Sequence, residues 1–244
     1  SIFFSTVVVI YLLITYKKKF FNSFYKSGLP GFVGGLILSL GYSGYVFAMY
    51  NTTVANTNFI IQTQTIFLAV FGYIFLKEKI SKLTLASIIL AFTGIILMVG
   101  NSLSPGQMSG NMVAFIMPIS FATLVLIVRK FPDTDMVPMQ FIAGIGATII
   151  GYLFSSKISI SSHDIFLGFL AGFFQVGLGF ILITIGARRT LSALVGIIML
   201  TEAVLGPLWA WMFVNENPPP VVLIGGAIVI SAVLLQFFNR KVVN

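Results

Sequence analysis

Nine long apolar runs make up most of this 244-residue sequence, and the few charged residues fall almost entirely between them. Only 8% of the residues are charged and 58% are hydrophobic, whereas about a quarter of the residues in a soluble domain are charged. A soluble core cannot hide this much apolar surface, and so few charges cannot cover a water-facing one. The composition therefore predicts a polytopic membrane protein and excludes a soluble enzyme, a disordered chain and a disulfide scaffold.

The apolar runs have lengths close to the 17–25 residues or so that an α-helix needs to cross a bilayer. Helices are expected because every backbone amide must find a partner inside the membrane. The runs also lack the apolar–polar alternation of a membrane β-barrel. We place the spans at residues 1–16, 30–50, 55–76, 83–99, 112–128, 137–155, 165–186, 191–214 and 221–238.

The positive charges predict the orientation of these spans. Thirteen of the fourteen Lys and Arg residues lie in alternate loops or in the C-terminal tail, and only Lys157 lies in a loop of the opposite side. Because cytoplasmic loops are rich in Lys and Arg, the C-terminus and the basic loops are expected in the cytoplasm, as in a bacterial inner membrane. The basic residues are Lys17, Lys18, Lys19, Lys26, Lys77, Lys79, Lys82, Arg129, Lys130, Arg188, Arg189, Arg240 and Lys241.

The counts of cysteine and histidine and the net charge exclude several kinds of chemistry. The chain has no cysteine and a single histidine, His163, so we expect neither a metal site nor a cofactor. The net charge of +8 is spread over short loops, which argues against nucleic-acid binding. The segment 41–44 fits the GxSG pattern of an intramembrane serine protease, but that chemistry needs a nearby histidine, and His163 is placed in a loop away from the cytoplasm. An enzyme is therefore not expected.

The two halves of the sequence resemble each other at a constant offset of 138 residues. Glu78 and Glu216 each follow the end of an apolar run, and the same offset aligns Thr63 with Thr201 and Gln64 with Glu202. Span 137–155 aligns with span 1–16, so span 112–128 has no counterpart. We therefore predict nine helices of a ten-helix plan: helices 2–5 in residues 1–100 and helices 6–10 in residues 108–244. Each repeat would have five helices. Because five crossings end on the opposite side of the membrane from where they began, the second repeat would be inverted relative to the first, as in many secondary transporters.

These motifs give the sequence its resemblance to a known family. Residues 52–56 and 75–81, with the related segments 187–193 and 201–207, resemble the EamA-type members of the drug/metabolite transporter superfamily. The resemblance covers nearly the whole chain and is specific for the superfamily but not for a substrate. It implies a multi-pass transporter of amino acids, amines, nucleosides, organic acids or drugs, which such proteins often export.

Glu202 is the most conspicuous candidate because it is the only ionisable residue inside a predicted span. A charge at the bilayer centre costs about 3 kcal/mol or more. One hypothesis makes Glu202 a counterion for substrate or a proton-coupling acid, and the other makes it a structural acid hydrogen-bonded between helices. Its helical face carries Trp209, which would line the site or face lipid.

Uncharged polar side chains supply the other candidate binding residues. Asn58, Gln62 and Thr65 are expected to share one helix face, and Gln64 is the repeat partner of Glu202. Such groups bind a polar substrate at little desolvation cost, but they also serve as hydrogen bonds between helices. Tyr42 and Gln175, in equivalent helices of the two repeats, are weaker candidates. Gln140, near the end of a span, is expected at the membrane interface.

Three further residues are candidates for a gate or a hinge. Pro207 interrupts a predicted helix, which suits a hinge but is also tolerated as ordinary packing. Glu78 and Glu216 close equivalent helices on opposite membrane faces, where they would pair with cations or remain solvated.

The sequence thus predicts a secondary transporter that works by alternating access and carries small polar or amphipathic metabolites. Export is the expected direction of transport. Protons are the candidate coupling ion, through Glu202. The expected partners are a small-molecule substrate and the lipid bilayer, and the oligomeric state stays open between monomer and homodimer. The alternatives are a passive channel or lipid scramblase, which would need no coupling acid, and a purely structural membrane subunit.

Overall fold

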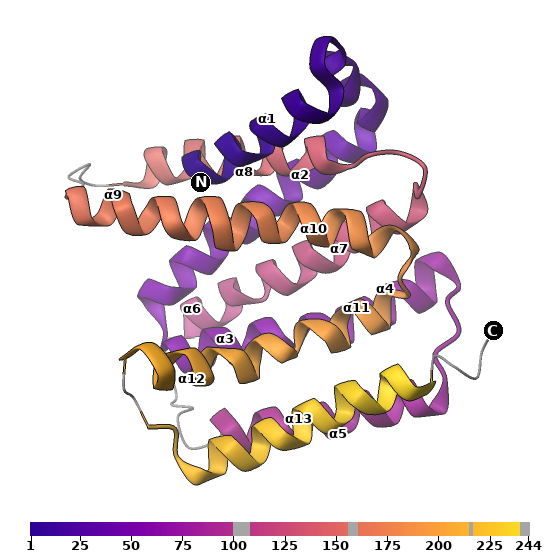
Figure 1. Ribbon diagram of the computed structural model, residues 1–244, viewed down its shortest axis with the longest axis vertical. Coiled ribbons are helices and arrows are strands. Elements are labelled where there is room, and N and C mark those ends of the chain that lie inside the picture. The colour runs from indigo at the N-terminus through magenta and orange to yellow at the C-terminus, as the bar shows by residue number, and fades with distance from the viewer. Residues whose placement is uncertain (100–107, 156–160, 215–216, 240–244) are drawn as a thin grey trace. The chain divides into compact units, whose positions relative to one another are not determined.

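The computed structural model describes residues 1–99, 108–155, 161–214 and 217–239, and these residues form helices joined by short turns (Figure 1). They contain no β-strand. The α-helices are α1 (Ile2–Tyr16), α2 (Phe20–Asn51), α3 (Val54–Gln62), α4 (Gln64–Leu76), α5 (Lys82–Val99), α6 (Met108–Ala114), α7 (Ile116–Lys130), α8 (Val137–Phe154), α9 (Ser162–Phe169), α10 (Gly179–Gly186), α11 (Ser192–Met199), α12 (Thr201–Val214) and α13 (Pro220–Asn239).

Six helical runs within the described residues are long and apolar enough to cross a membrane. They confirm the predicted class, an all-α polytopic membrane protein. The first run, Ile2–Asn51, has 50 residues, about 75 Å at the rise of an α-helix and far more than one crossing needs. It contains two of the predicted spans. The helices Lys82–Met98 and Pro220–Gln236 are apolar but shorter, so the count of nine crossings stays a prediction.

Three interruptions divide these helices, and two of them follow directly from residue type. A 3₁₀ turn, Lys17–Lys19, separates α1 from α2. Within α2, Gly28 adopts φ 54°, a left-handed conformation that glycine tolerates best. Pro30 follows and lacks the amide hydrogen that a continuous helix would need. Helix α6 ends at Ala114 for the same reason. Pro118, four residues later, has no amide hydrogen to donate to the carbonyl of Ala114.

The chain forms two compact units. Unit 1 consists of residues Ser1–Val46 and Thr123–Thr190, and unit 2 of residues Phe47–Ala122 and Leu191–Asn244. Each unit therefore combines one segment from the first half of the sequence with one from the second half.

The core of unit 1 lies where α1 packs against α8 and against the π-helical stretch Leu170–Leu178 between α9 and α10. A Cβ at Gly144 of α8 would collide with the Oγ of Ser5 and would lie 3.0 Å from a ring carbon of Phe4. The buried apolar side chains of this core are Phe4, Val7, Val8, Leu12, Val137 and Ile181.

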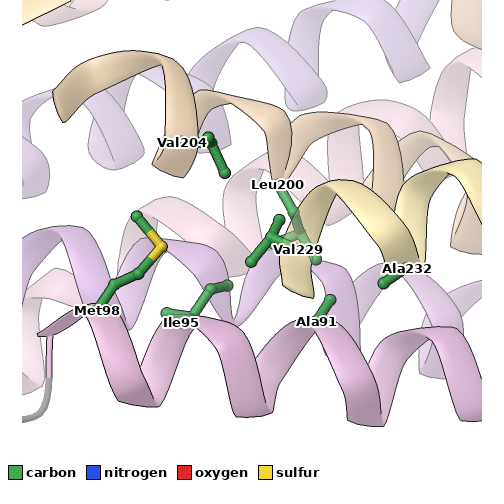
Figure 2. Close-up of a cluster of buried hydrophobic side chains, with 7 residues drawn as sticks. All are labelled: Ala91, Ile95, Met98, Leu200, Val204, Val229 and Ala232. Carbon is green, nitrogen blue, oxygen red and sulfur yellow. The ribbon is translucent and has the colours of Figure 1, made fainter. Parts of the chain in front are cut away.

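The core of unit 2 is built on the pair α5 and α13, which run antiparallel: Thr84 meets Gln236, and further along Gly94 meets Gly225. Figure 2 shows the side chains that fill the space between this pair and the break between α11 and α12. They are Ala91, Ile95, Met98, Leu200, Val204, Val229 and Ala232, all buried. This cluster holds the broken helices of unit 2, which carry most of the candidate residues.

Candidate substrate site

The predicted spans 55–76 and 191–214 are both helical, and each is broken once within unit 2. The first breaks at Thr63, between α3 and α4, and the second at Leu200, between α11 and α12. Neither break contains a proline or glycine. Because α4 begins at Gln64 and α12 at Thr201, the offset of 138 places the two breaks within one residue of each other.

Hydrogen bonding at the two breaks is also alike. The Thr63 hydroxyl donates to the carbonyl oxygen of Ile60 at 2.5 Å, and the Thr201 hydroxyl donates to that of Ile198 at 2.7 Å. The two donor residues are 138 residues apart along the chain, and so are the two acceptor residues. A threonine hydroxyl that bonds a carbonyl of the preceding turn competes with the helical ladder, which favours a local tightening of the helix.

The polar side chains around the first break are buried. Gln62, Gln64 and Thr65 are 6%, 2% and 0% exposed. The Thr65 hydroxyl donates to the carbonyl of Gly196 at 3.1 Å, so it ties α4 to α11. The Oε1 of Gln62 has no hydrogen-bond partner among the described residues. Asn58 is exposed, unlike Gln62 and Thr65. Asn58 and Gln62 lie four residues apart within α3 and therefore share a helix face. The break at Thr63 separates these two residues from Thr65, which lies in α4, so no continuous helix face runs through all three residues.

Glu202 lies in the first turn of α12, immediately after the second break. Its side chain is exposed, and no hydrogen bond or ion pair ties it to the described part of the chain. A carboxylate in this position interacts favourably with the N-terminal end of the helix dipole. The hypothesis of an acid hydrogen-bonded between helices thus gains no support from the described residues. Trp209, two turns on, is 50% exposed, and its ring lies 5.7 Å from that of Phe213.

Pro207 is half-buried inside α12, which continues through it. The interruption of this span therefore lies seven residues before the proline, at Leu200, and not at Pro207 itself. Its role as a hinge stays a prediction.

Glu78 binds the start of a helix from the other half of the chain. Its carboxylate accepts the backbone N–H of Ser192 at 2.9 Å and the Ser192 hydroxyl at 3.2 Å. Lys77, in the left-handed conformation, turns the chain so that the Glu78 N–H donates to the carbonyl of Gly72 at 3.0 Å. Glu78 thus caps the N-terminus of α11, where a negative charge is stabilising. Its repeat partner, Glu216, lies outside the described residues.

In unit 1, Tyr42 begins a chain of hydrogen bonds through the core. Its hydroxyl donates to Oε1 of Gln140 at 3.1 Å, and Nε2 of Gln140 donates to the Thr184 hydroxyl at 2.9 Å. Thr184 in turn donates to the carbonyl of Phe180 at 2.6 Å. Gln140 is 0% exposed, so the expectation of an interfacial side chain is wrong. It lies near the start of α8, but that end of the helix packs inside unit 1.

Gln175, the other candidate in unit 1, is exposed on the π-helical stretch Leu170–Leu178. Such stretches are rare and often occur at functional sites. The structure therefore distributes the candidates over both units, with Tyr42 and Gln175 in unit 1 and the remaining described candidates in unit 2.

Sequence reasoning missed two residues that organise these sites, Thr184 and Ser192, and assigned the wrong environment to a third, Gln140. A buried glutamine near a helix start resembles an interfacial one in sequence. Thr184 and Ser192 are small polar residues of a kind that occurs throughout apolar helices, so no signal distinguished them.

The long apolar helices define the class: this is a multi-pass membrane protein. More specifically, the chain belongs to the EamA-like transporter family, whose model matches residues 1–100 and 108–238. This membership confirms the resemblance found in the sequence.

Two further comparisons identify similar proteins. An uncharacterized transporter of Methanothermobacter thermautotrophicus is 20% identical over 205 residues, which are 78% of this chain and 59% of that protein. The chain thus spans about three fifths of the length of this curated relative. A solved crystal structure matches 99% of this chain and 98% of its own, with a TM-score of 0.69 and 14% sequence identity. At this identity it shows a shared fold and nothing further.

Proposed function

We propose that this protein is a secondary transporter that moves small polar or amphipathic metabolites across the membrane by alternating access, with export as its main direction. The single observation that carries the proposal is the pair of helix breaks in unit 2, at positions related by the 138-residue offset. Broken helices frequently form the substrate sites of transporters with inverted repeats, because their freed backbone groups and helix ends can bind a ligand.

Pairing of the helices supports an inverted repeat. The packed pairs α1 with α8 and α5 with α13 each join two helices that the offset relates. Helices related by an inverted repeat are expected to meet in this way around a local two-fold axis.

Side chains at the breaks suit a polar substrate. Glu202 is exposed at the start of α12, whereas Gln62 and Gln64 are buried beside the other break. A carboxylate favours an amine or another cationic group, and neutral amides bind zwitterions without a large desolvation cost. We assign Glu202 as the residue that holds a cationic substrate group or exchanges it for a proton.

Ligand-dependent thermal stability of the purified protein tests this proposal. A panel of amino acids, amines, nucleosides, organic acids and drugs is screened for a rise in melting temperature, since a ligand that binds only the folded state must stabilise it. Ligand at one hundred times its Kd stabilises by about 2.7 kcal/mol. We expect one class to stabilise the wild type and to lose that effect in Glu202→Gln. The matched control is Glu78→Gln, which neutralises an acid that caps a helix.

Transport into proteoliposomes separates the proposal from a passive channel. A transporter gives saturable uptake of the ligand found in the screen, and proton coupling makes that uptake respond to a pH gradient in the wild type but not in Glu202→Gln. Flux that rises linearly with concentration and is unchanged in Glu202→Gln would exclude alternating access in favour of the channel or scramblase.

A further inference from the structure

A short segment between the first two membrane helices combines unpaired positive charge with exposed aromatic rings. Residues 17–26, which we name the lysine–aromatic segment, have the sequence KKKFFNSFYK. They begin with the 3₁₀ turn Lys17–Lys19 and continue as a helix that ends before Gly28. The left-handed conformations of Lys17 and Gly28 separate this helix from both neighbouring membrane helices.

One face of the segment holds it against unit 1. Phe20 and Phe24 pack against the core cluster of that unit, and the ring of Phe24 lies 5.5 Å from that of Phe141. Ser23 and Ser27 are buried on the same face and donate to carbonyls of the preceding turn. The segment is therefore a fixed part of the unit.

The opposite face presents two columns of side chains away from the protein. Phe21 and Tyr25, four residues apart, are 82% and 85% exposed. Asn22 and Lys26, also four residues apart, form an adjacent exposed column. An aromatic column beside a polar and basic one is the pattern of a helix that lies in the plane of the membrane interface.

The lysines of this segment differ from the arginines of the other basic loops of unit 1. Arg188 pairs with Asp135, Arg129 donates to the carbonyl of Thr190, and Arg189 lies 4.0 Å from Asp133. In contrast, the side chains of Lys17, Lys18, Lys19 and Lys26 are exposed and form no hydrogen bond or ion pair with any described residue. Four positive charges are thus available to an external anion.

We propose that the lysine–aromatic segment is a binding surface for anionic phospholipid headgroups. Phe21 and Tyr25 enter the interfacial region of the bilayer, and the four lysines contact the phosphates of the surrounding leaflet. The bilayer is the occupant that the structure favours, because the segment lies within the 50-residue helical run Ile2–Asn51, between the predicted spans 1–16 and 30–50. Each lysine near an anionic membrane surface contributes about 1 kcal/mol of attraction.

Native mass spectrometry of the detergent-purified protein, titrated with phosphatidylglycerol or phosphatidylcholine, tests this surface. We expect the wild type to prefer phosphatidylglycerol. The triple variant Lys17→Gln, Lys18→Gln, Lys19→Gln should lose apparent affinity for that lipid by about tenfold or more, with its weaker binding of phosphatidylcholine unchanged. These side chains are exposed, so the substitutions leave the fold intact.

The matched control removes the same charge elsewhere, with Lys79→Gln, Lys82→Gln and Lys130→Gln, three exposed lysines outside the segment. It should retain the affinity of the wild type. An equal loss in both triple variants would overturn the proposal by showing a response to net charge alone. A wild type that binds both lipids equally would also overturn it, and would leave an acidic protein as the partner to seek.

Salt and the aromatic column provide two independent checks. Raising the ionic strength should weaken phosphatidylglycerol binding to the wild type far more than to the triple lysine variant, because salt screens exposed charges. The double variant Phe21→Ser, Tyr25→Ser should bind both lipids more weakly, since it removes the insertion that does not depend on headgroup charge. Binding that is insensitive to salt, or to the loss of both rings, would contradict the proposed surface.

Discussion

At the scale of single residues, the hydrogen-bonded chain through Gln140 should dominate the polar contribution to the stability of unit 1. Gln140→Leu leaves the hydroxyl of Tyr42 without this partner, which costs about 1–3 kcal/mol for an unsatisfied buried group, whereas Thr184 keeps its hydrogen bond to the carbonyl of Phe180. The melting temperature should fall clearly, whereas Tyr42→Phe, which removes one donor, should cost about 0.6 kcal/mol. The control is Gln175→Leu, an exposed glutamine, and an equal fall there would contradict a structural role for this chain.

Single residues were also where the sequence was least informative. Glu202 was identifiable because any acid in a long apolar run is costly and therefore conspicuous. The partners of Gln140 and Glu78 were not identifiable, since Thr184 and Ser192 lie 44 and 114 residues away along the chain. Such contacts depend on which helices pack together, and helical periodicity does not contain that information.

At the scale of helices, the cap that Glu78 provides should stabilise the first turn of α11. Glu78→Ala removes the acceptor of the Ser192 N–H, at a cost of about 1 kcal/mol. Glu78→Gln keeps a side-chain oxygen and should cost less. Hydrogen exchange at the amide of Ser192 measures the effect locally, and unchanged protection in Glu78→Ala would exclude the cap.

Close approach of α5 and α13 depends on two glycines. A Cβ at Gly225 would lie 2.5 Å from the backbone oxygen of Gly94, so Gly225→Ala must push the helices apart. We expect a loss of about 1–3 kcal/mol, typical of overpacking. Gly179→Ala in α10 is the control, because nothing lies within 4 Å of its added Cβ. Equal melting temperatures for both variants would contradict the tight packing of α5 on α13.

Helix positions followed from the sequence, but helix continuity did not. The break before α7 has a proline within one turn, Pro118, and such a break can be expected from composition. The breaks at Thr63 and Leu200 have neither proline nor glycine, and at each of them a threonine hydroxyl bonds the preceding turn. Hydroxyl groups bond the preceding turn in unbroken helices as well, as Thr148 does in α8, although its acceptor lies four residues back rather than three. Tertiary packing therefore decides where a break forms.

For the whole molecule, apolar run length and loop charge predict the class of fold, because the bilayer imposes both. The membrane requires long apolar helices, and their boundaries are set by the first charged or turn-forming residues. The composition of the two compact units, in contrast, does not follow from these sequence features. Each combines segments from both halves of the sequence, and no local pattern reveals this exchange. The repeat offset of 138 residues is the one sequence feature that relates the helices paired within each unit.

Orientation in the membrane is the prediction that the whole sequence makes most sharply, and a chain without cysteine allows a direct test. Single cysteines at Lys18, Lys79 and Lys130, all exposed, should react from the cytoplasmic side with a membrane-impermeant maleimide. Cysteines at His163 and Asn217, also exposed, should react from the other side. A permeant maleimide should label all five variants, and the cysteine-free protein should give no signal. If Lys130→Cys and His163→Cys reacted from the same side, helix α8 would not cross the bilayer, and the charge bias would no longer define the orientation.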